Sequence, residues 1–267
     1  TEGRRISPTT AIKRLKAVKR FMEWAHTNRY LDELPRNVKK IHLVDGLQHN
    51  EPDPQVFTRK EVRELFGEAY RSGQEANVTN HRAALYVLLG LNCGYGQMDI
   101  ATLRHEHIDW QKGIIDRGRN KTKRKTRSDQ AHKLWPITLK LLKAEATDPK
   151  EHDLVLLTLR GSRPLVEESV DGTTAKTNPI GLALSKVRRS LVKKGKTHWS
   201  GPGKGIKYLR KTGAQWLEDN HPETRFDKRY LGQKVTDVVR HYRKVNNAPY
   251  FEALDAMGEH FGLESLI

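Results

Sequence analysis

Residues 207–242 read KYLRKTGAQWLEDNHPETRFDKRYLGQKVTDVVRHY, and three short groups within this stretch indicate a chemistry. Lys207 and Arg210 stand one helical turn apart. A Leu-Gly-Gln group ends at Gln233, and Tyr242 comes nine residues later. A tyrosine hydroxyl is a weak nucleophile near neutral pH because its pKa is about 10. Cations fixed beside it would stabilise the charge that develops as it attacks a phosphodiester, so the pattern is typical of phosphate chemistry on DNA.

A segment further upstream, residues 89–103, reads LGLNCGYGQMDIATL. Together with the three groups it resembles the motifs of the tyrosine recombinases, the phage integrase family, over nearly all of the chain. The resemblance implies a mainly α fold with a small antiparallel β-sheet (α+β), in which part of a helical core-binding domain precedes a tyrosine recombinase catalytic domain. It also implies an activity: site-specific cutting and rejoining of duplex DNA through a covalent 3'-phosphotyrosyl link, with no cofactor and no ATP.

The same resemblance assigns roles to individual residues. Tyr242 would be the nucleophile, and Tyr250 is its nearest rival. Arg210 would hold a nonbridging oxygen of the scissile phosphate with its planar, permanently charged fork. Lys207, where many relatives have His, would donate to the same phosphate. Gln233, where the family most often has His or Trp, could donate a hydrogen bond but could not act as an acid or a base.

A run of basic residues, 121–127, lies between two strand-like segments and should form the turn that joins them. In the family this turn carries a lysine that protonates the leaving 5' oxygen. Lys121 is our choice for this lysine, and Lys123 and Lys125 stay open as alternatives. The flanking strands and the basic composition favour DNA contact over a merely solvated charge run. The residues expected to contact DNA are Lys123, Arg124, Lys125, Lys16, Arg20, Lys211 and Arg240.

The first catalytic arginine of the family falls on Gly96 in this chain. Removal of a phosphate-stabilising arginine can lower a rate by about 10³ to 10⁵. Arg82 and Arg104 are possible substitutes in space, and Asp99 is expected to orient a neighbouring arginine. Two alternatives therefore stay open: an active DNA strand transferase, or an integrase-like DNA-binding protein whose catalysis is lost or weakened.

Composition favours a polyanionic partner. The 267 residues include 49 Lys and Arg against 32 Asp and Glu, which leaves a net charge of +17. Such a balance favours binding to phosphates with release of counterions, so duplex DNA is the expected partner. No apolar run approaches the roughly 18 residues of a membrane span, and we expect no membrane partner. The one cysteine, Cys93, excludes an intramolecular disulfide, and the spacing of His105 and His107 does not suit a metal site.

These features predict a cytoplasmic, nucleoid-associated protein of a mobile element. The resemblance implies a homo-tetramer on DNA, with a monomer as the alternative form without it. An RNA-binding helical protein is a weaker alternative, because the five tryptophans look like packing residues. The chain begins at Thr1 without an initiator Met, so we expect a fragment of a longer protein. An apolar stripe near the C-terminus could dock on a neighbouring subunit or pack within the same one, and it comprises Phe251, Leu254, Met257 and Phe261.

Two domains are expected, with a Pro-containing linker between them. Residues 1–50 would hold the C-terminal part of the core-binding domain and the linker, and residues 56–267 the catalytic domain. Ser7-Pro8 and apolar residues at helical spacing predict a helix over residues 8–27, whose stripe should pack inward.

Further elements are expected in the second domain. Thr58 and Glu61 form a capping box that opens its first helix. Residues 113–116 and 132–137 read as strands of a small antiparallel sheet. Asn178 caps a helix that runs to about residue 194.

Overall fold

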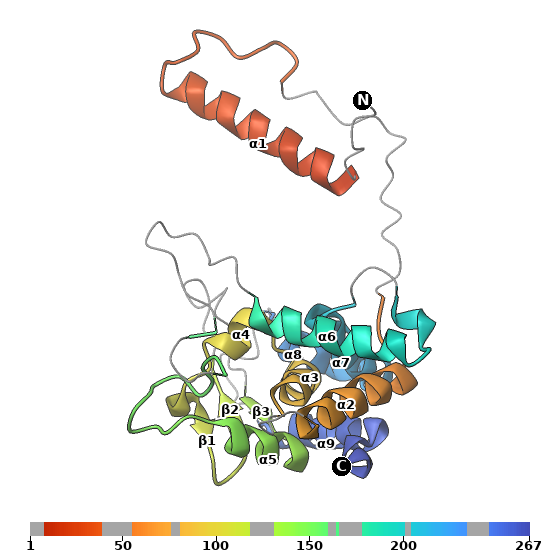
Figure 1. The fold of residues 1–267 in the computed structure, drawn as a ribbon. Coiled ribbons are helices and arrows are strands. Elements are labelled where there is room, and N and C mark those ends of the chain that lie inside the picture. Colours follow the sequence, from red (N-terminus) through yellow and green to blue (C-terminus); the bar gives the residue numbers. More distant parts are fainter. Residues whose placement is uncertain are drawn as a thin grey trace. The chain divides into compact units, whose positions relative to one another are not determined.

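The computed structural model describes residues 8–38, 55–75, 81–117, 131–159, 164–165, 178–200, 204–233 and 246–267 (Figure 1). Contacts between Cα atoms divide the chain into two compact units, Thr1–Pro54 and Gln55–Ile267. The assignment of these units as core-binding and catalytic domains stays a prediction. Some predicted site residues lie outside the described residues: Lys121, Lys123, Arg124, Lys125, Arg240 and Tyr242.

The first unit contains one described helix, α1 (Pro8–Thr27), followed by turns as far as residue 38. The helix has the predicted extent, and Lys16 and Arg20 are exposed on it. Its apolar stripe packs inward only in part, since Ala25 is buried whereas Val18 is 53% and Phe21 64% exposed. The reason is that no second helix among the described residues of this unit covers the stripe.

Trp24 corrects the interpretation of the tryptophans as packing residues. Its side chain is 54% exposed, and its ring stacks on those of Phe21 and Tyr30 with centroid distances of 6.0 and 5.4 Å. Trp135 and Trp199 of the second unit are buried, as expected. The first unit therefore presents an aromatic surface beside its basic residues.

The second unit is built around α3 (Arg82–Asn92), which is apolar on all sides and buried over residues 84–92. Four helices pack against it, as can be followed in Figure 1: α2 (Arg59–Gln74), α5 (Pro136–Glu145), α6 (Pro179–Lys193) and α7 (Ile206–Asn220). Each of these four helices turns one apolar face toward α3, so α3 lies at the centre of the hydrophobic core.

Side-chain caps fix where two of these helices begin, as predicted. Thr58 Oγ1 accepts a hydrogen bond from Glu61 N at 3.2 Å, and the Glu61 carboxylate accepts one from Thr58 N at 2.8 Å. At the start of α6, Asn178 Oδ1 accepts from Gly181 N at 2.8 Å. Both caps satisfy donors that would otherwise be unpaired in a first helical turn.

Over the described residues, the small sheet has three antiparallel strands in the order β1 (Ile108–Asp109), β2 (Ile114–Asp116) and β3 (Ala131–Lys133). Ile115 of β2 pairs with Ile108 on one side and with His132 on the other. The fold class predicted from the sequence is confirmed. The strand predicted over residues 132–137 is shorter, because Pro136 begins α5 and a proline suits the first turn of a helix.

The last helix, α9 (Ala248–Phe261), belongs to the core of its own unit. Leu254, Met257 and Phe261 of its apolar stripe are buried, and the helix packs against α2, α7 and β3. Trp135 Nε1 also donates a hydrogen bond to the Leu254 carbonyl at 2.7 Å. Of the two interpretations of this stripe, packing within the same subunit is therefore the one observed. Short 3-10 helices lie at His105–His107, Thr197–Trp199, Pro222–Thr224 and Leu263–Leu266.

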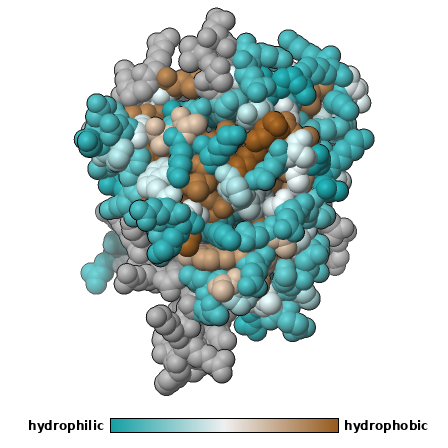
Figure 2. Space-filling model, turned by 90° about the horizontal axis from the view of Figure 1, so that it is seen from below, coloured by the Kyte–Doolittle hydropathy of each residue, from teal (hydrophilic) through white to brown (hydrophobic). Residues whose placement is uncertain are grey.

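A groove of about 700 Å³ runs between the start of α5 and the end of α9. Leu134, Ile137 and Leu263 are among its lining residues, and an ion pair at 2.6 Å between Lys133 and Asp255 stands at its edge. Figure 2, a view from below, shows apolar surface hollowed among hydrophilic side chains.

Gly258→Ala tests the close approach of α9 to Trp135. A Cβ at Gly258 would lie 2.8 Å from Trp135 Nε1, so we expect a loss of about 1–3 kcal/mol in the free energy of unfolding. Gly67→Ala on α2 is the matched control, since its Cβ would meet only Leu266 at 3.9 Å. The control should raise stability by up to about 1 kcal/mol. Urea unfolding measures both, and equal effects would contradict the packing.

Candidate phosphate site

Arg210 on α7 lies where three of the sequence motifs meet. Its Nη1 donates a hydrogen bond to the carbonyl of Gly94, in the segment that follows α3. Its Nη2 donates to the carbonyl of Leu231, in the Leu-Gly-Gln group. Hydrogen bonds from a charged donor are about twice as strong as neutral ones. The Arg210 guanidinium therefore joins Gly94, 116 residues before it in the chain, to Leu231, 21 residues after it.

Tyr230, the last residue of α8 (Phe226–Tyr230), seats the Leu-Gly-Gln group against α3 and α7. Its side chain is fully buried, and its hydroxyl donates to the Leu91 carbonyl at 2.6 Å. Two glycines make room for the ring. A Cβ at Gly94, which has φ of +62°, would lie 2.7 Å from it, and a Cβ at Gly213 would clash with the hydroxyl. Burial raises the pKa of Tyr230, so it stays neutral.

Gly96 is the N-cap of α4 (Gln97–Ala101). Its φ of −85° is open to any residue, and a Cβ there would come no closer than 3.4 Å to a neighbouring atom, Asp99 Oδ2. The backbone therefore does not require glycine at this position. The Asp99 carboxylate accepts from Gly96 N at 3.0 Å, so it caps α4. Among the described residues, Asp99 contacts a neighbouring arginine, Arg117, through its backbone carbonyl and not, as we expected, through the carboxylate.

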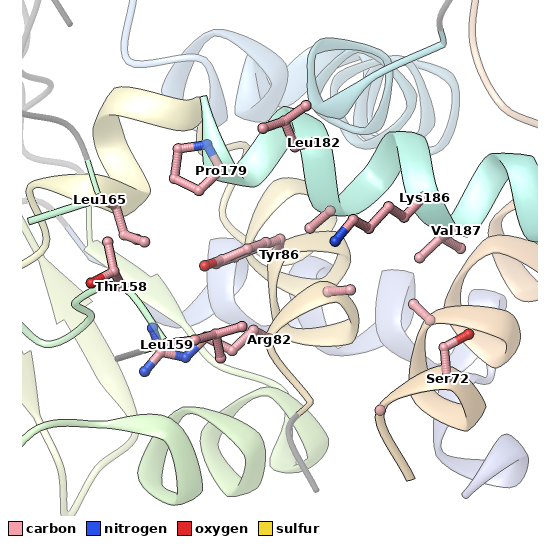
Figure 3. Close-up of a pocket in the computed structure, with 14 residues that line it drawn as sticks. Ser72, Arg82, Tyr86, Thr158, Leu159, Leu165, Pro179, Leu182, Lys186 and Val187 are labelled. Carbon is pink, nitrogen blue, oxygen red and sulfur yellow. The ribbon is translucent and has the colours of Figure 1, made fainter. Parts of the chain in front are cut away.

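Arg82 and Arg104, the possible substitutes for the missing arginine, are each paired with an acidic residue. Arg82 Nε pairs with Glu145 Oε2 at 2.8 Å, and its Nη1 donates to the Leu157 carbonyl. It begins α3, whereas Gly94 follows the other end of that helix about 15 Å away. Figure 3 shows Arg82 beside a largely apolar cavity of about 470 Å³ between α2, α3 and α6. Arg104 pairs with Asp153 at 3.4 Å.

Arg117 is a structural residue that the sequence did not single out. Its side chain is buried at the end of β2, where Nη1 donates to the Asp99 carbonyl at 2.7 Å and Nη2 to Thr102 Oγ1 at 3.2 Å. Its Cζ lies 5.7 Å from the centre of the Tyr95 ring. Arg117 thus holds the C-terminal end of α4. A lone arginine after a strand gives no signal of such a contact.

His132 on β3 and Tyr250 on α9 form a buried polar pair. His132 Nδ1 lies 3.0 Å from the Tyr250 hydroxyl. Burial, with the fields of Arg229 and Arg210, lowers the pKa of His132 to about 3, so its ring is neutral at pH 7. Burial also raises the pKa of Tyr250 well above its usual value. A sealed phenol cannot reach a phosphate, so the rival assignment of Tyr250 as nucleophile is wrong.

Three further described members of the predicted site lie on α7 or directly after α8: Lys207, Lys211 and Gln233. Lys207 is exposed one turn before Arg210 on α7, and Lys211 is half-buried with its Nζ 5.5 Å from the centre of the Tyr208 ring. Gln233 is exposed after α8, and its backbone N donates to the Lys228 carbonyl at 2.8 Å. The structure thus brings Arg210, Lys207 and Gln233 to neighbouring elements.

Within the described ranges, no group of three or more His, Cys, Asp or Glu side chains could hold a metal ion. The same part of the chain contains no helix that is long and apolar enough to span a membrane. Cys93 is a free thiol in the core, and burial raises its pKa. The described site is therefore made of guanidinium, ammonium, amide and backbone donors.

No protein-family model and no curated protein matches the chain. Among solved structures, it is similar to the Tn1549 transposon integrase in complex with transposon right end DNA, with 14% sequence identity and a TM-score of 0.58 over 96% of this chain and 80% of that one. The same integrase in complex with circular intermediate DNA gives 14% identity and a TM-score of 0.57 over 95% and 80%. An integrase from mycobacterium phage Brujita gives 12% and 0.48 over 96% and 74%. The Tn1549 likeness shows a shared fold.

The buried His132 should make the protein sensitive to acid. An unfolded chain protonates this histidine near pH 6.5, whereas the folded protein does so only near pH 3, so stability falls as the pH falls between these values. The slope is about 1.4 kcal/mol per pH unit. His132→Gln removes the titration, and the variant should lose less stability than the wild type between pH 6.5 and 4.

Urea unfolding at several pH values measures this difference, with His152→Gln at an exposed position as the control. An equal pH dependence for His132→Gln and the wild type would show that His132 is not held neutral.

Proposed function

We propose that this chain is a DNA-binding, site-specific recombinase or integrase that cleaves and rejoins duplex DNA. The observation that carries the proposal is the position of Arg210. Its guanidinium bonds to carbonyls of both the first motif and the Leu-Gly-Gln group, at Gly94 and Leu231. A guanidinium has five N–H donors in a planar fork, so contacts to carbonyls are compatible with holding a phosphate oxygen. The fold shared with a DNA-bound integrase supports the same conclusion.

In the proposed reaction the Tyr242 phenol gives its proton to solvent, its oxygen bonds to the scissile phosphorus, and the bond to the 5' oxygen breaks. Lys121 gives the leaving oxygen its proton, and Arg210 stabilises the charge on the phosphoryl oxygens. Lys207 and Gln233 donate further hydrogen bonds. Attack of a 5' hydroxyl on the phosphotyrosyl link then rejoins a strand and releases the phenol. The phosphodiester energy is kept in the link, so no ATP is consumed.

The described flanks of Tyr242 are compatible with this role. Tyr242 precedes Asn246 by four residues, and a chain extends at most about 3.3–3.6 Å per residue. On the described side of this stretch, Asn247 is bonded to Arg229 of α8. Arg229 stands two residues before Leu231, whose carbonyl Arg210 contacts. The proposal requires the Tyr242 phenol and Arg210 to meet around one anion.

Gly96 favours a second candidate function, an integrase-like protein that binds DNA without cutting it. This position lacks the arginine of the family, and Arg82 and Arg104 are each paired with an acidic residue. The net charge of +17 would support binding in either case. Binding of this kind weakens steeply with salt, because log K falls by about 0.9 per phosphate neutralised for each unit of log salt concentration.

Duplex DNA is the proposed partner, through the exposed Lys207 and, in the first unit, the exposed Lys16 and Arg20. We further propose a homo-tetramer on DNA and a nucleoid-associated, cytoplasmic location. Because Leu254 and Met257 are already buried against their own unit, such a tetramer would use surfaces other than this stripe of α9.

Trapping on nicked duplexes tests the enzyme. A pool of nicked substrates with a randomised site lets the cleaved fragment diffuse away, so an active protein should accumulate an adduct that survives SDS. Tyr242→Phe should abolish the adduct and keep salt-sensitive binding, because only the nucleophilic oxygen is removed. Tyr30→Phe, at a tyrosine that is 73% exposed, is the control. Binding by the wild type with no adduct anywhere in the pool would refute cleavage and support the second candidate.

Gly96→Arg tests whether the missing arginine limits the chemistry. A Cβ at position 96 would meet only Asp99 Oδ2, at 3.4 Å, so the backbone tolerates a side chain there, and we expect adduct formation to rise by about 10²- to 10³-fold. Gly96→Leu adds bulk without charge and should give no gain. Single-turnover rates at saturating DNA measure the effect. A rate for Gly96→Arg equal to that of an active wild type would mean that another cation already fills the role.

A further inference from the structure

Three aromatic side chains at the C-terminal end of α1 form a continuous stack. The Phe21 and Trp24 rings have centroids 6.0 Å apart and planes inclined by 27°, and the Trp24 and Tyr30 rings have values of 5.4 Å and 20°. The turn that ends the helix places Tyr30, because Arg29 has a left-handed φ of +61° and Tyr30 N then donates back to the Ala25 carbonyl at 2.8 Å. The end of the helix therefore builds the stack.

The stack is open to solvent. Phe21 is 64%, Trp24 54% and Tyr30 73% exposed. Phe21 and Tyr30 are the two ends of the stack, so each has one ring face that no other ring of the stack covers. A nucleic-acid base can stack on such a face whatever its sequence, because every base has a π-face. Unpaired bases could therefore extend the stack at either end.

Cations lie on the same side of α1 as the rings. Residues four or seven positions apart share one side of a helix, and Arg20 stands four residues before Trp24 and Arg14 seven before Phe21. Cations that follow the phosphates beside rings that take the bases are typical of proteins that bind single strands. In the described part of this unit, the exposed Lys and Arg residues outnumber the exposed acids: Lys13, Arg14, Lys16, Arg20, Arg29 and Arg36 against Glu23, Asp32 and Glu33.

We propose that the stack of Phe21, Trp24 and Tyr30 binds unpaired bases of single-stranded DNA. The positive charge beside the rings complements the phosphates of such a strand. Bases inside a duplex already stack on one another, whereas unpaired bases offer free faces. The choice of DNA over RNA rests on the proposed function, in which a cut strand can leave its duplex. None of the three rings belongs to the candidate phosphate site, so strand binding can be measured without cleavage.

An abasic strand separates stacking from charge. Oligothymidylate and an abasic oligonucleotide of equal length carry the same phosphates, and only the first has bases. The full chain should bind oligothymidylate about 5- to 150-fold more tightly, the ratio that corresponds to one stacked base. Trp24→Leu keeps apolar bulk without a ring and should remove most of this ratio, whereas Trp24→Phe should keep it. Equal affinities of the wild type for the two strands would overturn the proposal.

Val18→Ala is the matched control, because Val18 is an exposed apolar residue of the same helix and has no ring. It should leave the affinity for oligothymidylate unchanged. An equal loss for Val18→Ala and Trp24→Leu would indicate a general apolar surface for a protein partner and would overturn the proposal. Two further results would do the same: an equal loss of duplex binding by Trp24→Leu, or tighter binding of the wild type to oligouridylate than to oligothymidylate.

Trp24 also gives a direct signal of stacking. Of the five tryptophans, all of them among the described residues, Trp24 is exposed and the other four are buried or half-buried. Oligothymidylate should quench tryptophan fluorescence in the wild type, and Trp24→Phe should bind the strand without this quenching. Strand binding by the wild type with no quenching would place the bases elsewhere and overturn the proposal.

The outcomes separate this inference from the proposed function. Adduct formation by a protein whose strand binding does not depend on bases would overturn the stacking proposal alone. Base-dependent binding and quenching by a protein that forms no adduct would support the stacking proposal and count against cleavage.

Discussion

The hydrogen bonds from Arg210 to the carbonyls of Gly94 and Leu231 are the contacts on which the rest of the candidate site depends. They join segments from three parts of the chain, and each is strengthened by the charge of its donor. Breaking them would leave two carbonyls without this partner, at a cost of about 1–3 kcal/mol for each that stayed buried. Arg210 therefore serves the fold as well as the proposed chemistry, and a loss of activity on its removal alone would not separate the two roles.

Close packing around Tyr230 is what allows Arg210 to reach both carbonyls. The ring fits because Gly94 and Gly213 carry no Cβ, and its hydroxyl reaches the carbonyl of Leu91 at the end of α3. The Leu-Gly-Gln group follows Tyr230 directly, so its location is set by this buried ring. Packed interiors tolerate few changes of volume. The position of Gln233 is thus determined by residues that never touch a phosphate.

Local signals predicted much of this fold, and tertiary contacts explain what they missed. Helix α1 and the caps at Thr58 and Asn178 follow from residues close in sequence, as does Arg210 from its motif. Arg117 and Arg229 look like ordinary members of a basic chain. Their roles arise only when α4 meets β2 and when α8 meets α9. The prediction that the apolar stripe of α1 packs inward holds only in part for a related reason, since periodicity identifies an apolar face but not what covers it.

The two ends of α4 explain how the fold can persist without an arginine at position 96. Asp99 caps its first turn through Gly96 N, and Arg117 binds its last turn through the Asp99 carbonyl and Thr102. Neither contact uses a side chain at position 96, so the orientation of α4 does not depend on the residue there. A change at this position therefore alters the charge available to a phosphate much more than the stability of the unit. In the proposed function, the difference between cleavage and binding alone depends on how many cations converge on the phosphate, and the described part of the chain contributes Arg210 as its one guanidinium bonded to both motifs.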